Sequence, residues 1–314
     1  MGKKKSSPAL RKFAAFLAAI RKPLLVLLFL ATLGVSAAYG FYRLRQHVEH
    51  TLAFPQTAPK LVMKDRPPWM SEGLAQRILD SAQPRGTRSA LDHQLVKDVA
   101  DILQFNPWVR HVNKVRRLFT KSPGDTVEVD CDYRAPMALV PYRNQYILVD
   151  ADGYKLPERF PAAQPPRIMF GPDGNLNLRI IQGVAAMPPF PDGQKWVGDD
   201  LQAGLDLVKL LYAKPFAEEI HRVNVANFRG RQKPREAQLV LITKYGSEIR
   251  WGAPVRSAPN FELPPTEKLH RLAVIYGRFH RIDAHRSWLD IRFDKITQPA
   301  EEDTVVQANR PTRR

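Results

Sequence analysis

The stretch QFNPWVRHVNKVRR (residues 104–117) joins a predicted helix to a predicted strand. Asn106 suits a helix C-terminus, and Pro107 cannot continue the helix because it lacks an N–H and its ring clashes with the preceding turn. Trp108 is left to pack at the corner, and extended chain begins at Val109. The sequence therefore predicts a structural corner formed by Asn106, Pro107, Trp108 and Val109.

The basic side chains of this stretch raise the alternative of a nucleic-acid patch, but the next strand offers them acidic partners. In DTVEVDCDYR (residues 125–134), apolar and acidic residues alternate with the period of a half-buried strand. The predicted inner face holds Val127, Val129, Cys131 and Tyr133, and the outer face holds Glu128, Asp130, Asp132 and Arg134. The outer acids predict cross-strand charge pairs with residues 109–117.

Composition bounds the class of protein. The chain has 314 residues, 44% hydrophobic and 25% charged, enough for two globular domains with tails. The net charge is +17, but residues 1–50 carry nine Lys and Arg against one acid, and no RRM or zinc-finger motif is present. We therefore expect no nucleic-acid partner. The single cysteine, Cys131, excludes an intrachain disulfide and is predicted to be a small core residue.

The N-terminal region predicts a membrane anchor. PLLVLLFLATLGVSAAYGFY (residues 23–42) holds no charge, and as a helix it would measure about 30 Å, the thickness of a hydrocarbon core. The heavier basic flank precedes it, which predicts a cytoplasmic N-terminus and an extracytoplasmic C-terminal part. The alternative is a cleaved signal peptide, because SAA at residues 36–38 resembles a cleavage site. Both readings export the bulk of the chain.

The exported part divides into two predicted α+β domains. The order strand, two helices and two strands predicts a compact first domain, and a β-rich domain with flanking helices follows it. The predicted segments are a basic cytoplasmic tail (1–22), a transmembrane helix in contact with lipid (23–42), a stem (43–58), the first domain (59–136), the β-rich domain (137–294) and a disordered tail (295–314).

No motif in the chain predicts catalysis. P-loop, dinucleotide, nucleophile-elbow and zinc-protease signatures are absent, and His270, His280 and His285 lack metal-ligand spacing. Asp150 and Asp152 belong to a predicted turn. We expect no catalytic residue, metal or cofactor. An anchored cell-wall enzyme is the alternative, and it would require a pocket of convergent carboxylates or a His beside a nucleophile.

Several short motifs, taken in order, resemble the bacterial cell-division family FtsQ/DivIB over about residues 20–294. They are NPWVRHVNKVRR, DTVEVDCDYRAPMA (125–138), YILVDADGYKLP, EIRWG and SWLDIRF. Arg134, Pro136 and Ala138 match the family pattern, whereas Tyr133 stands where Glu is usual. The resemblance implies that residues 59–136 form a POTRA domain and that residues 137–294 form the family's β domain.

The resemblance also implies a function. Members are non-enzymatic scaffolds of the divisome at the septum of the inner membrane. They bind the coiled-coil proteins FtsB (or DivIC) and FtsL, and they recruit other division proteins through the POTRA domain. The edge strand that would receive FtsB by strand addition corresponds here to Trp288, Leu289, Asp290, Ile291, Arg292 and Phe293.

Two alternatives stay open at this stage. Leu289, Ile291 and Phe293 could be plain core residues, with the edge covered by the chain's own tail. The protein could also be another POTRA-bearing envelope component, from a secretion or polymer-export system.

Overall fold

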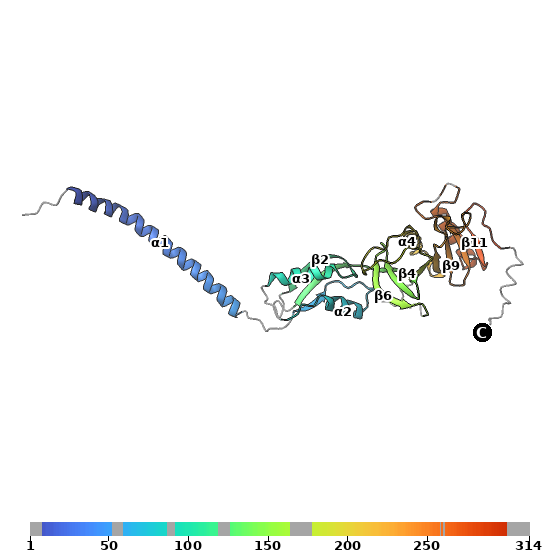
Figure 1. The fold of residues 1–314 in the computed structure, drawn as a ribbon, viewed down its shortest axis with the longest axis horizontal. Helices are drawn as coiled ribbons and strands as arrows, with labels where there is room; N and C mark the ends of the chain where they lie inside the picture. Colours follow the sequence, from blue (N-terminus) through green and yellow to red (C-terminus); the bar gives the residue numbers. More distant parts are fainter. Residues whose placement is uncertain are drawn as a thin grey trace, which may run out of the picture.

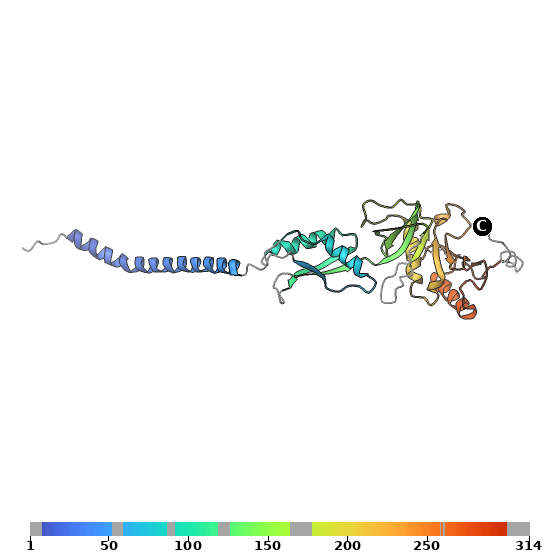
Figure 2. The ribbon, with the colours of Figure 1, turned by 90° about the horizontal axis from the view of Figure 1, so that it is seen from below.

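The structure is a computed structural model that describes residues 8–51, 59–86, 92–118, 126–163, 178–257, 259 and 261–299. A long N-terminal helix, a small α+β unit and a larger unit built on one sheet follow one another along the molecule (Figures 1 and 2). The predicted α+β class with an N-terminal apolar helix is therefore observed.

Helix α1 (Pro8–Thr51) contains the predicted span. Its segment Leu25–His47 has a mean hydropathy of 1.9, and in the described part of the chain no other helix is long and apolar enough to cross a membrane. The helix continues past the predicted end of the span through Thr51, where the sequence predicted a stem. Residues 1–7 of the predicted tail and 52–58 of the predicted stem lie outside the described residues.

The small unit has a three-stranded sheet in the order β1-β3-β2, with β1 parallel and β2 antiparallel to β3. Its elements are β1 (Lys60–Met63), α2 (Glu72–Ser81), α3 (His93–Gln104), β2 (Val109–Leu118) and β3 (Thr126–Tyr133). Ser71 and Asp92 stand at the starts of two periodic apolar segments, which predicts that they cap helices, and both do so: Ser71 Oγ accepts from the N–H of Leu74 at 3.3 Å, and Asp92 Oδ1 accepts from that of Gln94 at 2.9 Å.

Two register shifts decide which face of β2 is buried. The pairing with β3 shifts between Val109 and His111, and again between Val112 and Lys114. Each shift inserts one extra residue, so that a side chain three positions further on returns to the same face. Val109, Val112 and Val115 therefore all pack into the core beneath the helices, although strict alternation would separate them.

The outer face of the same sheet carries the predicted charge pairs. Arg116 lies opposite Glu128, with 2.7 Å between Nε and Oε1. Lys114 lies opposite Asp130, but the carboxylate of Asp130 pairs with Lys64 Nζ, just after β1, at 2.7 Å. The Arg116–Glu128 pair thus confirms the predicted cross-strand charge pairing at one position of the basic run.

The larger unit is built on an eight-stranded sheet in the order β11-β10-β9-β8-β7-β4-β5-β6. The strands are β4 (Pro136–Tyr142), β5 (Gln145–Asp150), β6 (Lys155–Pro161), β7 (Arg179–Gln182), β8 (Ile220–Asn224), β9 (Leu239–Thr243), β10 (Glu248–Gly252) and β11 (Trp288–Asp290). The helices are α4 (Asp199–Leu211), α5 (Pro265–Phe279) and the short 3₁₀ turns η1 (Ala217–Glu219) and η2 (Phe228–Gly230).

The two faces of this sheet pack against different partners. Helices α4 and α5 cover one face, where Val149, Leu205 and Leu272 belong to one core. On the other face, Leu148 of β5 joins the core of the small unit. Side chains alternate along β4, β5 and β7, so each of these strands contributes apolar residues both to the core beneath α4 and α5 and to the core of the small unit. This shared packing joins the two units.

Strand β6 was not predicted. The sequence indicated a turn followed by a proline-rich connection, because Pro157 and Pro161 interrupt the segment. Proline cannot donate to a β-ladder but is tolerated on an edge strand, and β6 is the outermost strand of its sheet.

Two smaller expectations also differ. The stretch RSWLDIRF (286–293) predicts a final strand, whereas β11 comprises only Trp288–Asp290. The apolar spacing of residues 91–105 predicts a helix with Leu95, Val99, Ile102 and Leu103 facing inward, but Ile102 is 46% exposed on α3.

Candidate functional site

The first three of the predicted partner-binding residues form β11, at one end of the eight-stranded sheet, and the other three follow it directly. The backbone bonds to β10 include those of Ser287, whose carbonyl accepts at 3.0 Å, and of Ile291, whose N–H donates at 3.4 Å. Backbone groups alternate sides along a strand, so those of Trp288, Asp290 and Arg292 point away from β10. These outward groups form what we call the β11 edge.

Two positions of the β11 edge are already paired within the chain. The N–H of Asp290 donates to the carbonyl of Thr297 at 2.9 Å, and the N–H of Thr297 donates back at 3.3 Å. The carbonyl of Arg292 accepts from the N–H of Leu263 at 2.8 Å. Among the described residues, none pairs with the outward backbone of Trp288. The edge is therefore open at its start and covered further along.

The six predicted side chains separate into three environments. Leu289 and Ile291 are buried in the core of the sheet, whereas Phe293 is 40% exposed. Asp290 and Arg292 are also buried, and they bind each other through two contacts, with Nη2 to Oδ2 at 2.7 Å and Nε to Oδ1 at 3.0 Å. Such a two-point pair is strong and geometrically specific.

Trp288 is the accessible member of the set. Its ring is half-buried and lies against the guanidinium of Arg250, with 4.3 Å from Cζ to the ring centroid. This cation–π contact holds the indole over the outer strands of the sheet. At Trp288 an unpaired backbone and a large amphipathic side chain therefore occur together.

A buried carboxylate fixes the loop that leads into β11. Asp283 is fully buried, accepts from Ser247 Oγ at 2.8 Å and pairs with Arg281 Nη2 at 2.7 Å. Burial alone would raise the pKa of Asp283, but hydrogen bonds from Arg281, Ser247 and the N–H of His285 outweigh it and hold the pKa below its usual value. The entry to the strand therefore depends on an ionised Asp283.

The predicted corner at Asn106 lies at the end of α3. Asn106 Oδ1 accepts from the N–H of Trp108 at 3.0 Å, and its carbonyl accepts from the N–H of Val109 at 2.9 Å. Trp108 is 4% exposed and its ring packs near that of Trp69, with 6.3 Å between the centroids. Pro107 is enclosed by these two hydrogen bonds, which join Asn106 to Trp108 and Val109 and turn the chain into β2. These contacts are those of a tight turn.

Cys131 and Asp150, two residues considered above for a chemical role, make contacts that stabilise the fold. Burial raises the pKa of the Cys131 thiol to about 11, so the unreactive thiol form dominates at neutral pH. Asp150 accepts from the N–H groups of Asp152 and Tyr154 at 2.9 and 2.7 Å and pairs with Arg134 at 2.9 Å. No group of three or more His, Cys, Asp or Glu that could hold a metal ion occurs within the described residues.

Comparison with known proteins gives no relative: no family model matches the sequence, and no curated protein matches it either.

The alternative that the chain's own tail covers the edge is borne out at Thr297, although the sequence singled out neither this residue nor Leu263, the second residue that covers the β11 edge. Thr297 lies in the segment predicted as a disordered tail (295–314), of which residues 295–299 are described, and Leu263 lies in a loop. Neither residue lies in a stretch with helical or strand periodicity, so the local sequence does not predict that either one bonds to the edge of a sheet.

Proposed function

We propose that this chain is a membrane-anchored, non-enzymatic scaffold of bacterial cell division, similar to FtsQ/DivIB. In this proposal residues 59–136 are a POTRA domain, α1 anchors the chain in the inner membrane with its N-terminus in the cytoplasm, and the larger unit binds FtsB- or DivIC-like and FtsL-like coiled-coil partners at the septum. The β11 edge receives the partner as an added strand.

One observation carries the proposal. Strand β11, the last strand of the described residues, is the end strand of its sheet, and the outward N–H and C=O of Trp288 have no partner in the described part of the chain. An exposed edge of this kind is a template for pairing with another chain, and most proteins protect such edges. The topology of the small unit supports it, because a strand, two helices and two strands in the order β1-β3-β2 agree with a POTRA domain.

The structure also indicates where to test strand addition. Substitution at Asp290 or Arg292 would disrupt a buried ion pair, so a loss of binding there would be confounded by a loss of folding. Trp288 provides a cleaner pair of variants. Trp288→Pro removes both the indole and the outward N–H, whereas Trp288→Ala removes the indole alone.

We expect Trp288→Pro to bind an FtsB-like partner about fivefold or more weakly than Trp288→Ala, since one backbone hydrogen bond contributes about 1 kcal/mol. The measurement is titration of the full chain in nanodiscs with the partner, and circular dichroism establishes that both variants fold. Equal affinities of two folded variants would remove the edge-strand mechanism.

Cellular localisation tests the wider assignment. A fluorescent fusion of the full chain that forms a midcell band supports a role in division. A uniform envelope signal would instead favour the alternative of a POTRA-bearing component of a secretion or polymer-export system.

A further inference from the structure

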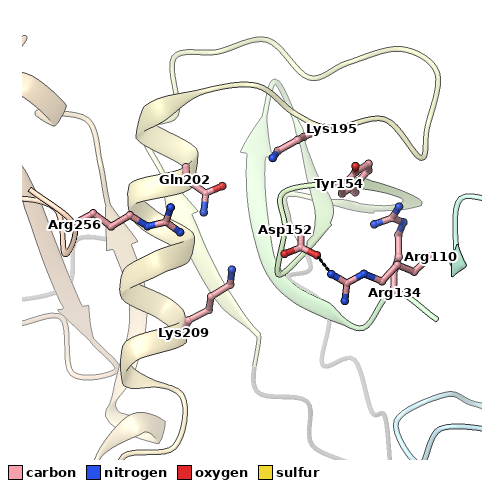
Figure 3. Close-up of a pocket in the computed structure, with 8 residues that line it drawn as sticks. All are labelled: Arg110, Arg134, Asp152, Tyr154, Lys195, Gln202, Lys209 and Arg256. Atoms are coloured by element: carbon pink, nitrogen blue, oxygen red, sulfur yellow. Dashed lines mark hydrogen bonds and ion pairs between the residues drawn. The ribbon is translucent and has the colours of Figure 1, made fainter. Parts of the chain in front are cut away.

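A basic cleft lies between α4 and the hairpin that joins β5 to β6, away from the β11 edge (Figure 3). The cleft has a volume of about 650 Å³ and its walls are polar. We call this space the basic cleft, and the residues that line it are Arg110, Arg134, Asp152, Tyr154, Lys195, Gln202, Lys209 and Arg256. They come from both units, because Arg110 belongs to β2 of the small unit.

The cleft holds more cations than acids. Each arginine has a carboxylate partner: Arg110 with Asp152 at 2.6 Å, Arg134 with Asp150 at 2.9 Å, and Arg256 with Asp206 at 2.7 Å. Lys195 and Lys209 have no ion-pair partner among the described residues. The cleft therefore carries an excess of two positive charges, which repel each other unless an anion lies between them.

The two lysines belong to opposite walls. Lys209 extends from α4 and Lys195 from the loop beside the β5–β6 hairpin, and Figure 3 shows the space between them. Gln202 and Lys209 are seven residues apart on one face of α4, which corresponds to about 10 Å along the helix axis. The donors are thus spread along the cleft instead of converging on one point.

The loop wall is held in place by packing. Tyr154 and Lys195 form a backbone bridge, and the N–H of the buried Trp196 donates to the carbonyl of Gly153 at 2.8 Å. The guanidinium of Arg134 stacks on the Tyr154 ring, with 3.7 Å from Cζ to the centroid. A fixed wall lowers the entropic cost of binding, because these groups are ordered before a ligand arrives.

We propose that the basic cleft binds an acidic peptide segment whose carboxylates pair with Lys195 and Lys209. In an extended peptide, residues three apart in the sequence point to opposite sides of the chain, so one carboxylate can reach Lys195 on the loop wall while the other reaches Lys209 on α4. A compact phosphate is less well matched. Phosphate sites gather backbone N–H groups at a helix N-terminus or a glycine-rich loop, whereas α4 lines this cleft with two side chains, Gln202 in its first turn and Lys209 in its last turn. The proposal does not depend on a role in cell division.

The test uses the full chain in neutral-lipid nanodiscs and a labelled seven-residue Gly/Ser peptide with glutamates at positions 2 and 5. Fluorescence anisotropy measures its Kd at low salt. We expect saturable binding that weakens several-fold at 300 mM salt, because charge pairing in an open cleft is screened. The same peptide with glutamine in place of glutamate should not bind.

The decisive variant is Lys195→Glu with Lys209→Glu, for which we expect at least a tenfold increase in Kd. The matched control is Lys97→Glu with Lys233→Glu, which makes the same change of charge at two exposed lysines outside the cleft. The control should change Kd less than twofold. Thermal unfolding tests the fold of each variant, and Lys195→Gln with Lys209→Gln replaces the reversal if it fails to fold.

Four results would overturn the proposal. The first is equal binding of the glutamate and glutamine peptides. The second is an equal loss of binding in the cleft and control variants, which would show attraction to net charge alone. The third is saturable binding of pyrophosphate, lost in the cleft variant, while the glutamate peptide does not bind, which would assign the cleft to a phosphate ligand instead. A protein that binds none of the probes would overturn it as well.

Discussion

The eight-stranded sheet ends in two edges that are protected in different ways. On the β6 edge, the N–H of Lys155 donates to the carbonyl of Gln194 at 3.0 Å, and its carbonyl accepts from Gly193 at 2.8 Å. Pro157 and Pro161 remove two further donors from the same strand. On the β11 edge, Thr297 covers Asp290 and Leu263 covers Arg292, but the backbone of Trp288 is left without a partner in the described chain.

The β6 edge is blocked against pairing with another chain, whereas the β11 edge can still accept a strand at Trp288. Proline and an internal loop block β6, and both are common devices against unwanted pairing. Thr297 pairs with β11 only through an isolated bridge, and the described chain ends two residues later. A partner strand that begins at Trp288 would need to displace only this contact to extend along β11.

The largest expected effect concerns the ion pairs that support each edge. Asp290→Ala would leave the buried guanidinium of Arg292 without its carboxylate, and we expect a loss of about 3–5 kcal/mol in the free energy of unfolding. At the other edge, Asp192→Ala should cost less, about 1–3 kcal/mol, because the Asp192 side chain is 24% exposed, against 5% for Asp290, and Lys155 keeps its hydrogen bond to the carbonyl of Pro189 at 2.7 Å. Urea unfolding of the full chain in detergent measures both. Equal losses would contradict the unequal dependence of the two edges on ion pairs.

An intermediate effect is expected from the loop before β11. The pKa of Asp283 is lower in the folded chain than in the unfolded chain, so its contribution to stability is present above the unfolded value of about 3.9. This contribution is lost as the pH falls through the folded pKa. Asp283→Asn should cost about 1.5–3 kcal/mol at pH 7, the range for hydrogen bonds to a charged group, and should reduce the fall in stability between pH 5 and pH 3. An unchanged pH profile in urea unfolding would rule out this role.

The smallest effect on stability is expected at Thr297. Thr297→Pro removes the N–H that donates to Asp290 and should change the free energy of unfolding by less than about 1 kcal/mol. The amide of Asp290 should nevertheless exchange faster with solvent, while the amide of Lys155 on β6 should not change. Hydrogen exchange read by NMR measures both. Unaltered protection of Asp290 would show that the N–H of Thr297 is not needed to keep the edge covered, because the carbonyl of residue 297 is still present to accept from Asp290.

Local patterns predicted most of the elements. Ser71 and Asp92 each begin a helix because their side chains accept from free backbone N–H groups, and this chemistry is readable from a few residues. The alternation in β3 gave the correct inner face, with Val127 and Val129 fully buried. For β2, the pattern left the buried face undefined, because the register shifts depend on the partner strand.

The candidate site was only partly readable. The chain order already places the strand at Trp288 last among the predicted strands. The burial of the Asp290–Arg292 pair could not be predicted in the same way, because Arg292 Nη1 also donates to the carbonyl of Arg235, 3.2 Å away in a loop distant in the sequence. The basic cleft drew on residues from 110 to 256, and no spacing in the sequence connects them.

The sequence by itself determined the apolar N-terminal helix, the corner at Asn106, the amphipathic helices and most of the strands, because these depend on side chains within a turn or two of each other. Only the tertiary structure decided which strands end the sheet, which residues cover them and where unpaired lysines face one another. Those properties arise from contacts between segments far apart in the chain, whose geometry is set by packing of the whole core.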